Sequence, residues 1–336
     1  MIPFALLNRL FMQEISNRLY INAFPPPIVS VVTSVYNRPA LLERALNSIL
    51  AQTFQNIEYI IVDDGSDENI DKIVIPFLNS APFPVLYLKK ENGGVHTGRN
   101  LGIKKARGQY LLILDSDDEF VPKAIETFLN AWSLIPENNR HRYREVTALC
   151  MDTKGKPLGD LYPENINYIN KKTARKIRRR LKAEHTALNR TDILQCHPWP
   201  EPEGVKFVAE SLIWRILDEK YDKWSINDCL RIYHQGTEDS LSTQFKRKTT
   251  QNCINDLFRH QYIVNNHKLY NLSIIERCKE VLLYLIFRKV LQNKCPLPNY
   301  TWINEGIQGS FNQLLKQALI IPSLVAIKLL RRRFYD

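Results

Sequence analysis

The chain has 336 residues, of which 44% are apolar, and this is enough for one large or two ordinary domains with a buried core. The composition excludes a disordered or a fibrous protein. The formal charge of +11, from 46 Lys and Arg against 35 Asp and Glu, favours anionic partners such as phosphates, acidic lipids or nucleic acid.

The N-terminal segment carries apolar residues at helical spacing, namely Phe4, Leu7, Phe11, Ile15 and Leu19. Polar residues between them interrupt any signal-peptide core, and no run reaches the ~18 apolar residues that a transmembrane helix needs. We therefore expect residues 1–27 to form an amphipathic helix and a linker. The six cysteines show no CxxC pair and no metal-finger spacing, so a cytoplasmic, reducing setting is expected.

From residue 28 onward, apolar strands alternate with helices. Residues 28–35 are strand-like, and Pro39 then opens an apolar-faced helix. Further strands are predicted at residues 59–62, 85–88 and 110–114. Strands without polar alternation, interleaved with helices, indicate a mostly parallel sheet covered on both faces, so an α/β fold is expected.

Acidic clusters follow two of these strands, where ligands bind in such sheets. Asp115, Asp117 and Asp118 offer oxygen ligands that suit Mg or Mn, and a metal there would bridge the protein to a diphosphate. The alternative is a solvated acidic turn or a helix N-cap. Asp63 and Asp64 end another strand, where a carboxylate can accept from a base N–H or a ribose hydroxyl, unless they are an ordinary Asp-Gly turn.

A glycine turn with a nearby arginine offers a further anion site. Asn92-Gly93-Gly94 presents backbone donors, and Arg99 carries a guanidinium suited to a diphosphate. The alternative is a turn followed by a surface arginine.

Four ordered motifs resemble those of the family 2 glycosyltransferases with the GT-A fold. They are Val29-Ser30-Val31-Val32 through Tyr36-Asn37-Arg38-Pro39, Val62-Asp63-Asp64-Gly65-Ser66, Arg99-Asn100-Leu101-Gly102 and Leu114-Asp115-Ser116-Asp117-Asp118. The resemblance covers roughly residues 28–122. One departure is Ser34-Val35, where many members have Pro-Thr, and it bears on individual base contacts.

The resemblance implies an inverting enzyme that uses a nucleotide-sugar, here a UDP-sugar, with Mg or Mn. It implies a metal site at Asp115 and Asp117. The residues that it implies for donor binding are Thr33, Ser34, Tyr36, Asn37, Asp63, Asp64, Arg99, Asp115 and Ser116.

The expected domain organisation follows the same resemblance. Residues 28–240 are expected to be a GT-A (Rossmann-like) domain, in which residues 28–122 bind the nucleotide-sugar and residues 123–240 form the acceptor side. Helical patterns dominate from Phe207, so residues 241–336 are expected to be a helical C-terminal extension.

Inversion needs one general base on the acceptor hydroxyl. Many family members place an acid four positions before a tryptophan, and Glu210 has this spacing to Trp214. The Phe-Val-x-Glu segment that ends at Glu210 resembles one found in a bacterial subgroup, and so does the acidic-His region that includes His185. The alternative is a solvent-facing helix glutamate, with Glu201 and Glu203 as rival bases.

Two basic segments remain. Residues 171–182 contain six arginines or lysines after Lys171-Lys172, and Arg331-Arg332-Arg333 lies near the C-terminus behind an apolar stretch. The second pattern suits a helix at an anionic membrane surface, and helix packing is the alternative.

We therefore expect a non-processive inverting transferase that moves a hexose, glucose or galactose, from a UDP-sugar to a glycan or lipid-linked acceptor in bacterial surface-polysaccharide assembly. The processive synthases of the superfamily carry a QxxRW motif and transmembrane helices, and this chain has neither. Two alternatives are an inactive GT-A scaffold in a glycan-assembly complex and a basic nucleic-acid-binding protein. For the latter the expected zinc-finger spacing and RNP-type motifs are missing, so no nucleic acid is expected as a partner.

Overall fold

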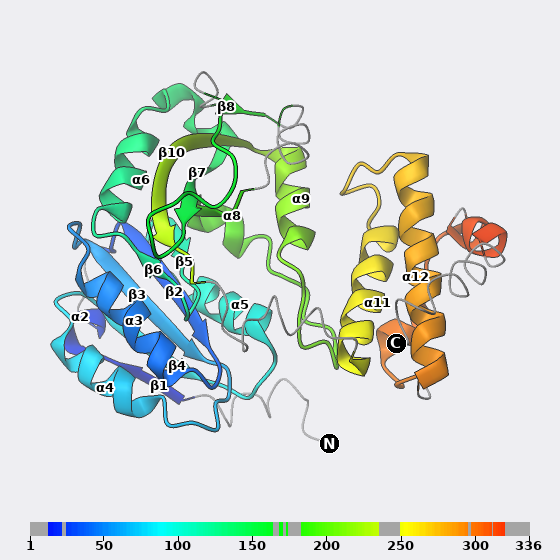
Figure 1. Ribbon diagram of the computed structural model, residues 1–336, viewed down its shortest axis with the longest axis horizontal. Helices are drawn as coiled ribbons and strands as arrows, with labels where there is room; N and C mark the ends of the chain where they lie inside the picture. The colour runs from blue at the N-terminus through cyan, green and yellow to red at the C-terminus, as the bar shows by residue number, and fades with distance from the viewer. Residues whose placement is uncertain are drawn as a thin grey trace. The chain divides into compact units, whose positions relative to one another are not determined.

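The computed structural model describes residues 13–21, 25–163, 168–170, 173, 183–234, 249–294, 297–310 and 312–319. The chain divides into two compact units (Figure 1). One comprises Met1–Pro198 with Lys220–Gln235, and the other comprises Trp199–Glu219 with Gly236–Asp336. Residues 199–219, expected within the 28–240 domain, thus group with the C-terminal helices, and a boundary at residue 240 stays a prediction.

The first unit is built on one mixed sheet with the order β1-β4-β3-β2-β5-β9-β7-β10-β6, and β8 pairs with β10. The strands are β1 (Gln13–Ser16), β2 (Val29–Val35), β3 (Ile57–Asp63), β4 (Val85–Lys89), β5 (Tyr110–Ile113), β6 (Glu119–Phe120), β7 (Tyr143–Met151), β8 (Tyr168–Ile169), β9 (His185–Arg190) and β10 (Asp222–Ile232). Strands β2 to β5 run parallel, while β9 lies antiparallel between β5 and β7. The predicted α/β fold with a mostly parallel sheet is confirmed.

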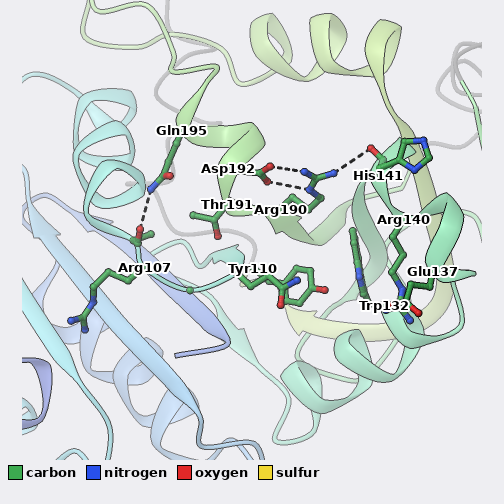
Figure 2. Close-up of a pocket in the computed structure, with 13 residues that line it drawn as sticks. Arg107, Tyr110, Trp132, Glu137, Arg140, His141, Arg190, Thr191, Asp192 and Gln195 are labelled. Atoms are coloured by element: carbon green, nitrogen blue, oxygen red, sulfur yellow. Dashed lines mark hydrogen bonds and ion pairs between the residues drawn. The ribbon is translucent and has the colours of Figure 1, made fainter. Parts of the chain in front are cut away.

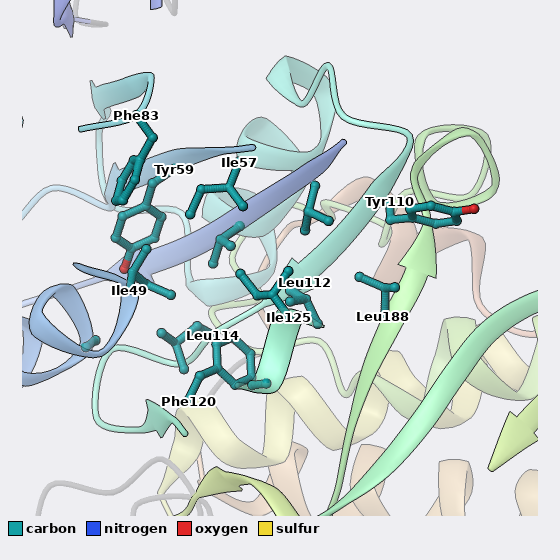
Figure 3. Close-up of a cluster of buried hydrophobic side chains, with 14 of the residues drawn as sticks. Ile49, Ile57, Tyr59, Phe83, Tyr110, Leu112, Leu114, Phe120, Ile125 and Leu188 are labelled. Carbon is teal, nitrogen blue, oxygen red and sulfur yellow. The ribbon is translucent and has the colours of Figure 1, made fainter. Parts of the chain in front are cut away.

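Helices α3 (Pro39–Leu50), α4 (Asp71–Ser80) and α6 (Ala124–Ser133) pack on one face of this sheet. Their apolar sides join every second residue of the strands in one core cluster, part of which is drawn in Figure 3. In that cluster Ile49 of α3, Tyr59 of β3 and Leu112 of β5 are completely buried. Burial on this scale, together with the covered second face, explains why these strands lack polar alternation.

Helix α5 (Val95–Lys105) packs on the opposite face, where it contacts β2, β3 and α8 (Thr191–Gln195). Two glycines allow a close approach. A Cβ atom at Gly98 would clash with the side chain of Ser34, and one at Gly102 would clash with Val32. Helix α5 therefore lies directly on β2 and carries Arg99 with it.

The N-terminal prediction is wrong at residues 13–16. These residues form β1 antiparallel to β4, with Ile15 opposite Tyr87, instead of part of an amphipathic helix. The edge of β4 offers unpaired backbone groups, and Asn17 fastens the segment there because its Oδ1 accepts from the Val85 N–H at 3.1 Å. Only α2 (Arg18–Ile21) is helical here, and the apolar residues before Gln13 lie outside the described residues.

The second unit is helical, with α9 (Ser211–Lys220), α11 (Thr250–Asn265), α12 (Ile274–Lys294) and α13 (Thr301–Glu305). Helices α11 and α12 pack together, and Leu257 and Val281 are fully buried. This confirms the helical C-terminal part. Within the residues that the structure describes, no helix is both long enough and apolar enough to cross a membrane. The basic segment at residues 171–182, except Thr173, and the tail beyond residue 319 lie outside those residues.

Candidate functional site

The predicted donor-site residues of the first unit lie at or near the carboxyl ends of neighbouring strands in the middle of the sheet. Strand β2 lies between β3 and β5, and the chain runs outward from β2 through β3 to β4 before it returns to β5 on the other side of β2. Such a reversal of strand order leaves a crevice at the carboxyl ends of the strands. Asn37 follows β2, Asp64 follows β3 and Asp115 follows β5, so all three border this crevice.

Asp64 fastens the glycine turn that precedes α5. Its carboxylate is 1% exposed and accepts from the backbone N–H of Gly93 at 3.0 Å, the N–H of Gly94 at 2.8 Å and the Lys90 ammonium at 2.5 Å. The backbone donors that the sequence analysis offered to a diphosphate are thus bonded to Asp64. Its predicted contact with the nucleotide remains a prediction.

Asp63 and Asn37 tie the ends of β3 and β2 together. The Asp63 carboxylate accepts from the Ser66 N–H at 2.9 Å, and the N–H of Asn37 donates to the Ser66 hydroxyl at 3.0 Å. Asn37 has a φ of 51°, a left-handed conformation that asparagine tolerates better than most residues. Its Oδ1 also accepts from the Asp67 N–H at 2.7 Å, so both predicted contact residues hold the turn in shape.

The residues at the end of β2 differ in their access to solvent. Thr33 is completely buried, and its hydroxyl donates to the Leu114 carbonyl at 2.8 Å, so its side chain holds β2 to the end of β5. Ser34 is half-buried beneath α5. Tyr36 is 44% exposed, so its aromatic ring is the most accessible of these three side chains.

The acidic segment after β5 is paired with arginines. Asp115 accepts from Arg99 at 2.5 Å through Oδ1, and its Oδ2 accepts from Arg231 of β10 at 3.4 Å. Arg38 donates to Asp117 Oδ2 at 3.1 Å. Asp118 Oδ2 lies 3.4 Å from Arg231 Nε, at ion-pair distance. The cluster was expected to need a bound cation to neutralise it, and within the protein these guanidinium groups already do so.

The charges shift the pKa values of the three carboxyl groups in different directions. Burial would raise the pKa of Asp115, but Arg99 and Arg231 outweigh burial and lower it. Burial and the neighbouring Asp115 raise the pKa of Asp117 against the effect of Arg38. Burial raises the pKa of Asp118 to about 7, although Arg231 opposes it. Asp115 is therefore the carboxylate that is most firmly ionised.

Sequence reasoning missed two basic residues of this site. Arg38 is part of the Tyr36-Asn37-Arg38-Pro39 motif, so its position was visible although it was given no role. Arg231 belongs to no sequence motif that we recognised. Only the pairing of β10 with β7 brings it to Asp115, which lies 116 positions earlier in the chain. Ser116, predicted for donor binding, is 5% exposed between the two aspartates.

Glu210 belongs to the second unit, directly before α9 as predicted. The Trp214 indole donates to Glu210 Oε2 at 3.3 Å, which is the contact expected of residues four apart on one helical face. Its side chain is half-buried, while Glu201 and Glu203 are exposed. Glu210 thus has an oriented carboxylate, and its role as the base remains a prediction.

The fit of Asp115 and Asp117 to a divalent metal is partial. No group of three or more His, Cys, Asp or Glu side chains with metal-binding geometry is present among the described residues. Mg²⁺ usually binds through one or two carboxylates and takes its other ligands from substrate phosphates and water. The side chain of Asp115 is 31% exposed and that of Asp117 is 17% exposed, so both side chains are partly accessible for such binding.

Comparisons with known proteins agree with this architecture. Residues 30–195 match the family model of Glycosyl transferase family 2. An uncharacterized glycosyltransferase of Rickettsia felis is 33% identical over 147 residues, which cover 43% of this chain and 23% of that protein. The minor teichoic acid biosynthesis protein GgaB of Bacillus subtilis is 39% identical over 103 residues, which cover 30% of this chain and 11% of that protein. The chain thus spans less than a quarter of either relative.

Among solved structures, Staphylococcus aureus TarS residues 1–349 in complex with UDP-GlcNAc has a TM-score of 0.53 at 17% identity. The match covers 91% of each chain. At this identity the likeness concerns the fold, and it agrees with the predicted GT-A architecture.

Proposed function

Since residues 30–195 match the family model of Glycosyl transferase family 2, we propose that the chain is an inverting, non-processive hexosyltransferase. Its donor is a UDP-sugar, with glucose or galactose as the transferred hexose. Its acceptor is a glycan or a lipid-linked oligosaccharide in cell-surface polysaccharide synthesis. The observation that carries the proposal is the arginine-paired acidic segment at the carboxyl end of β5, next to the end of β2, which is followed by the exposed Tyr36.

Similar proteins support the donor and the setting. TarS, which shares the fold, is described in complexes with UDP and with UDP-GlcNAc. GgaB, which shares sequence, is described as a teichoic acid biosynthesis protein. A uridine nucleotide and a surface polymer therefore fit this chain better than a nucleic acid does.

In the proposed reaction Tyr36 stacks on the uracil base, and the crevice edge formed by Asp115 and Asp117 faces the diphosphate. A divalent metal held there would neutralise the charge that grows on the leaving nucleotide. Arg99 and Arg231 hold the Asp115 carboxylate ionised and oriented, since they lower its pKa and bond both of its oxygens. Glu210, oriented by Trp214, removes the proton of the acceptor hydroxyl as that oxygen attacks the anomeric carbon.

An inactive scaffold with the same fold remains the second reading. The partly exposed side chain of Asp115 and the oriented carboxylate of Glu210 are features that a scaffold does not need, so they favour the enzyme. For the tail beyond residue 319, we propose association with the cytoplasmic face of an anionic membrane, on the basis of its apolar stretch before Arg331-Arg332-Arg333.

The test is release of UDP by the full chain from UDP-glucose, UDP-galactose and UDP-GlcNAc, each with Mg²⁺, with Mn²⁺ and with EDTA, and with GDP-mannose as the control donor. Metal-dependent release from a UDP-sugar supports the proposal. Binding of UDP without turnover of any donor would favour the scaffold. Release from GDP-mannose alone would refute the uridine donor.

A further inference from the structure

A cavity opens at the amino end of β5, the end of that strand opposite to Asp115 (Figure 2). Tyr110, the first residue of β5, lines it beside Arg190, the last residue of β9, which is its partner in the ladder. Asp115 lies five residues further along the chain, so at ~3.3 Å per residue the cavity is roughly 16 Å from the donor crevice. The cavity is therefore separate from the site described above.

The cavity has a volume of about 580 Å³. Pockets that bind small organic molecules have volumes of roughly 300–1,000 Å³. A single phosphate ion would leave most of this space empty, whereas a monosaccharide with one charged substituent is of suitable size. The volume therefore points to an organic ligand.

One buried polar atom in its wall, Thr191 Oγ1, has no hydrogen-bond partner among the described residues. Thr191 is only 5% exposed. Buried polar atoms in folded proteins are almost always hydrogen-bonded. This hydroxyl is thus positioned to bond a polar group of a ligand. The Trp132 indole, also in the wall, forms a hydrogen bond that lowers the pKa of Tyr110.

Three arginines line the cavity, and two of them, Arg190 and Arg107, form ion pairs or hydrogen bonds within the protein. Arg190 is held by Asp192, whose Oδ2 accepts at 2.5 Å, and by the His141 carbonyl at 3.2 Å. Arg107 donates to Glu58 at 2.8 Å, and Figure 2 shows its guanidinium directed away from Arg190. These contacts fix the frame of the cavity and leave the third arginine as its available cation.

That third arginine is Arg140. It donates from Nε to the Ile135 carbonyl at 3.0 Å and from one terminal nitrogen to the Ser133 carbonyl at 3.2 Å. Its other terminal nitrogen has no partner in the part of the chain that the structure describes. Burial raises the pKa of Tyr110, and Arg140 and Arg190 oppose that effect, so both guanidiniums lie near the Tyr110 hydroxyl.

We propose that this cavity binds a saccharide that carries a phosphate group. The phosphate accepts from Arg140, since a charged acceptor forms the strongest bonds with a guanidinium. A sugar hydroxyl bonds Thr191 Oγ1, which lies on the other side of Tyr110 from Arg140 (Figure 2). The C–H faces of the sugar pack against the aromatic pair of Tyr110 and Trp132, whose ring centroids are 4.9 Å apart. Sugar hydroxyls donate to Glu137 at the rim, which is exposed and has no bonded partner among the described residues. The site does not depend on the proposed transferase activity.

The test is calorimetric titration of the full chain with glucose 6-phosphate, with glucose and inorganic phosphate as comparison probes, in the presence and absence of UDP. We expect glucose 6-phosphate to bind at least 10-fold more tightly than either comparison probe, with or without UDP. Arg140→Gln should weaken that binding by about 10- to 100-fold, as expected for loss of a charged hydrogen bond. Arg142→Gln is the control, because this residue lies in the same short helix, η1 (Glu137–Arg142), but does not line the cavity.

Thr191→Val separates binding from folding. The native hydroxyl has no partner in the described part of the chain, so its removal should leave the melting temperature unchanged or raise it, while affinity for glucose 6-phosphate falls about 5- to 10-fold. Equal affinity for glucose 6-phosphate and inorganic phosphate would overturn the saccharide assignment. Absence of binding, binding that UDP abolishes, or binding that survives both Arg140→Gln and Thr191→Val would overturn the site.

Discussion

Arg231 donates to Asp115 Oδ2 at 3.4 Å, although 116 positions separate the two residues in the sequence. The same guanidinium donates from Nε to the Cys150 sulfur at 3.3 Å and from its other terminal nitrogen to the His185 carbonyl at 3.3 Å. Strands β7, β9 and β10 thus position one arginine against the acidic segment that follows β5. The strands of the second half of the sheet thus hold the acidic segment after β5 in position.

Replacing Arg231 by methionine should lower the free energy of unfolding by about 2–3 kcal/mol, because its hydrogen bonds to Asp115, the Cys150 sulfur and the His185 carbonyl would be lost. Urea denaturation measures the effect. Arg142→Met removes the ion pair of an exposed arginine with Asp222 and should destabilise the protein much less. Similar losses in the two variants would contradict the structural role given to Arg231.

Turnover should require Mg²⁺ or Mn²⁺, and Asp117→Ala should abolish it, because the diphosphate would lose part of its metal clamp. Rates with and without EDTA, and UDP binding measured by calorimetry in the presence of metal, check both parts. Asp228→Ala, which removes an exposed carboxylate on β10, is the matched control. Activity that persists in EDTA would refute the metal requirement.

Glu210→Gln should reduce the transfer rate by ~100-fold or more with donor affinity nearly unchanged, because glutamine keeps the bond from Trp214 but cannot take up a proton. Initial rates and UDP calorimetry are measured side by side, with Glu201→Gln and Glu203→Gln as controls. If Glu210→Gln is active and one of the controls is not, the wrong carboxylate has been chosen. If all three are active, Glu184 or His185 is the next candidate.

His185 should make stability depend on pH. Burial lowers the pKa of its imidazole to about 4, with Lys223 adding to the effect, so the folded protein favours the neutral ring. Because the folded-state pKa is below the ordinary value of 6.5, the contribution of His185 to stability is complete above 6.5 and is lost as the pH falls toward 4. As the pH falls from about 7 to about 4.5, the free energy of unfolding of the His185→Gln variant should therefore decrease less than that of the wild type. Equal losses in urea titrations would contradict this assignment.

The C-terminal tail should bind anionic membranes through its apolar stretch and terminal arginines. Liposome flotation of the full chain and of a truncation after residue 316 provides the measurement, with neutral vesicles as the control for charge. We expect flotation of the full chain alone, and with anionic vesicles only. Equal flotation of both proteins, or of neither, would refute membrane binding through the tail.

The first half of the fold was predictable because its signals are local. The apolar run of Val29–Val35 and the acidic turns after β3 and β5 are features of short segments, and parallel sheets place such strand ends together. Ile15 was misread, because a helical spacing of apolar residues says nothing about an open sheet edge nearby. The observed strand pairs with β4 about seventy residues later, a contact of tertiary origin.

The candidate site was predictable in position but less so in its contacts. Asp64 and Asp115 stand where their motifs predicted, yet their partners are Gly93, Gly94, Arg99 and Arg231. A motif gives the residue type at a strand end, and it does not give the hydrogen bonds that form when loops close over it. Arg231 in particular becomes visible only when β10 is paired with β7.

The close packing of α5 on β2, which Gly98 and Gly102 allow, limits the positions at which this fold can accept substitutions. A side chain at either glycine would separate the helix from the strand and move Arg99 away from Asp115, so neither position is open to the gradual substitution by which enzymes acquire new sugar preferences. Such change is left to the loops that follow the strands, where insertions and replacements leave the buried sheet intact. Relatives that use different sugars can therefore share one donor frame, and attempts to redesign the specificity should begin in those loops.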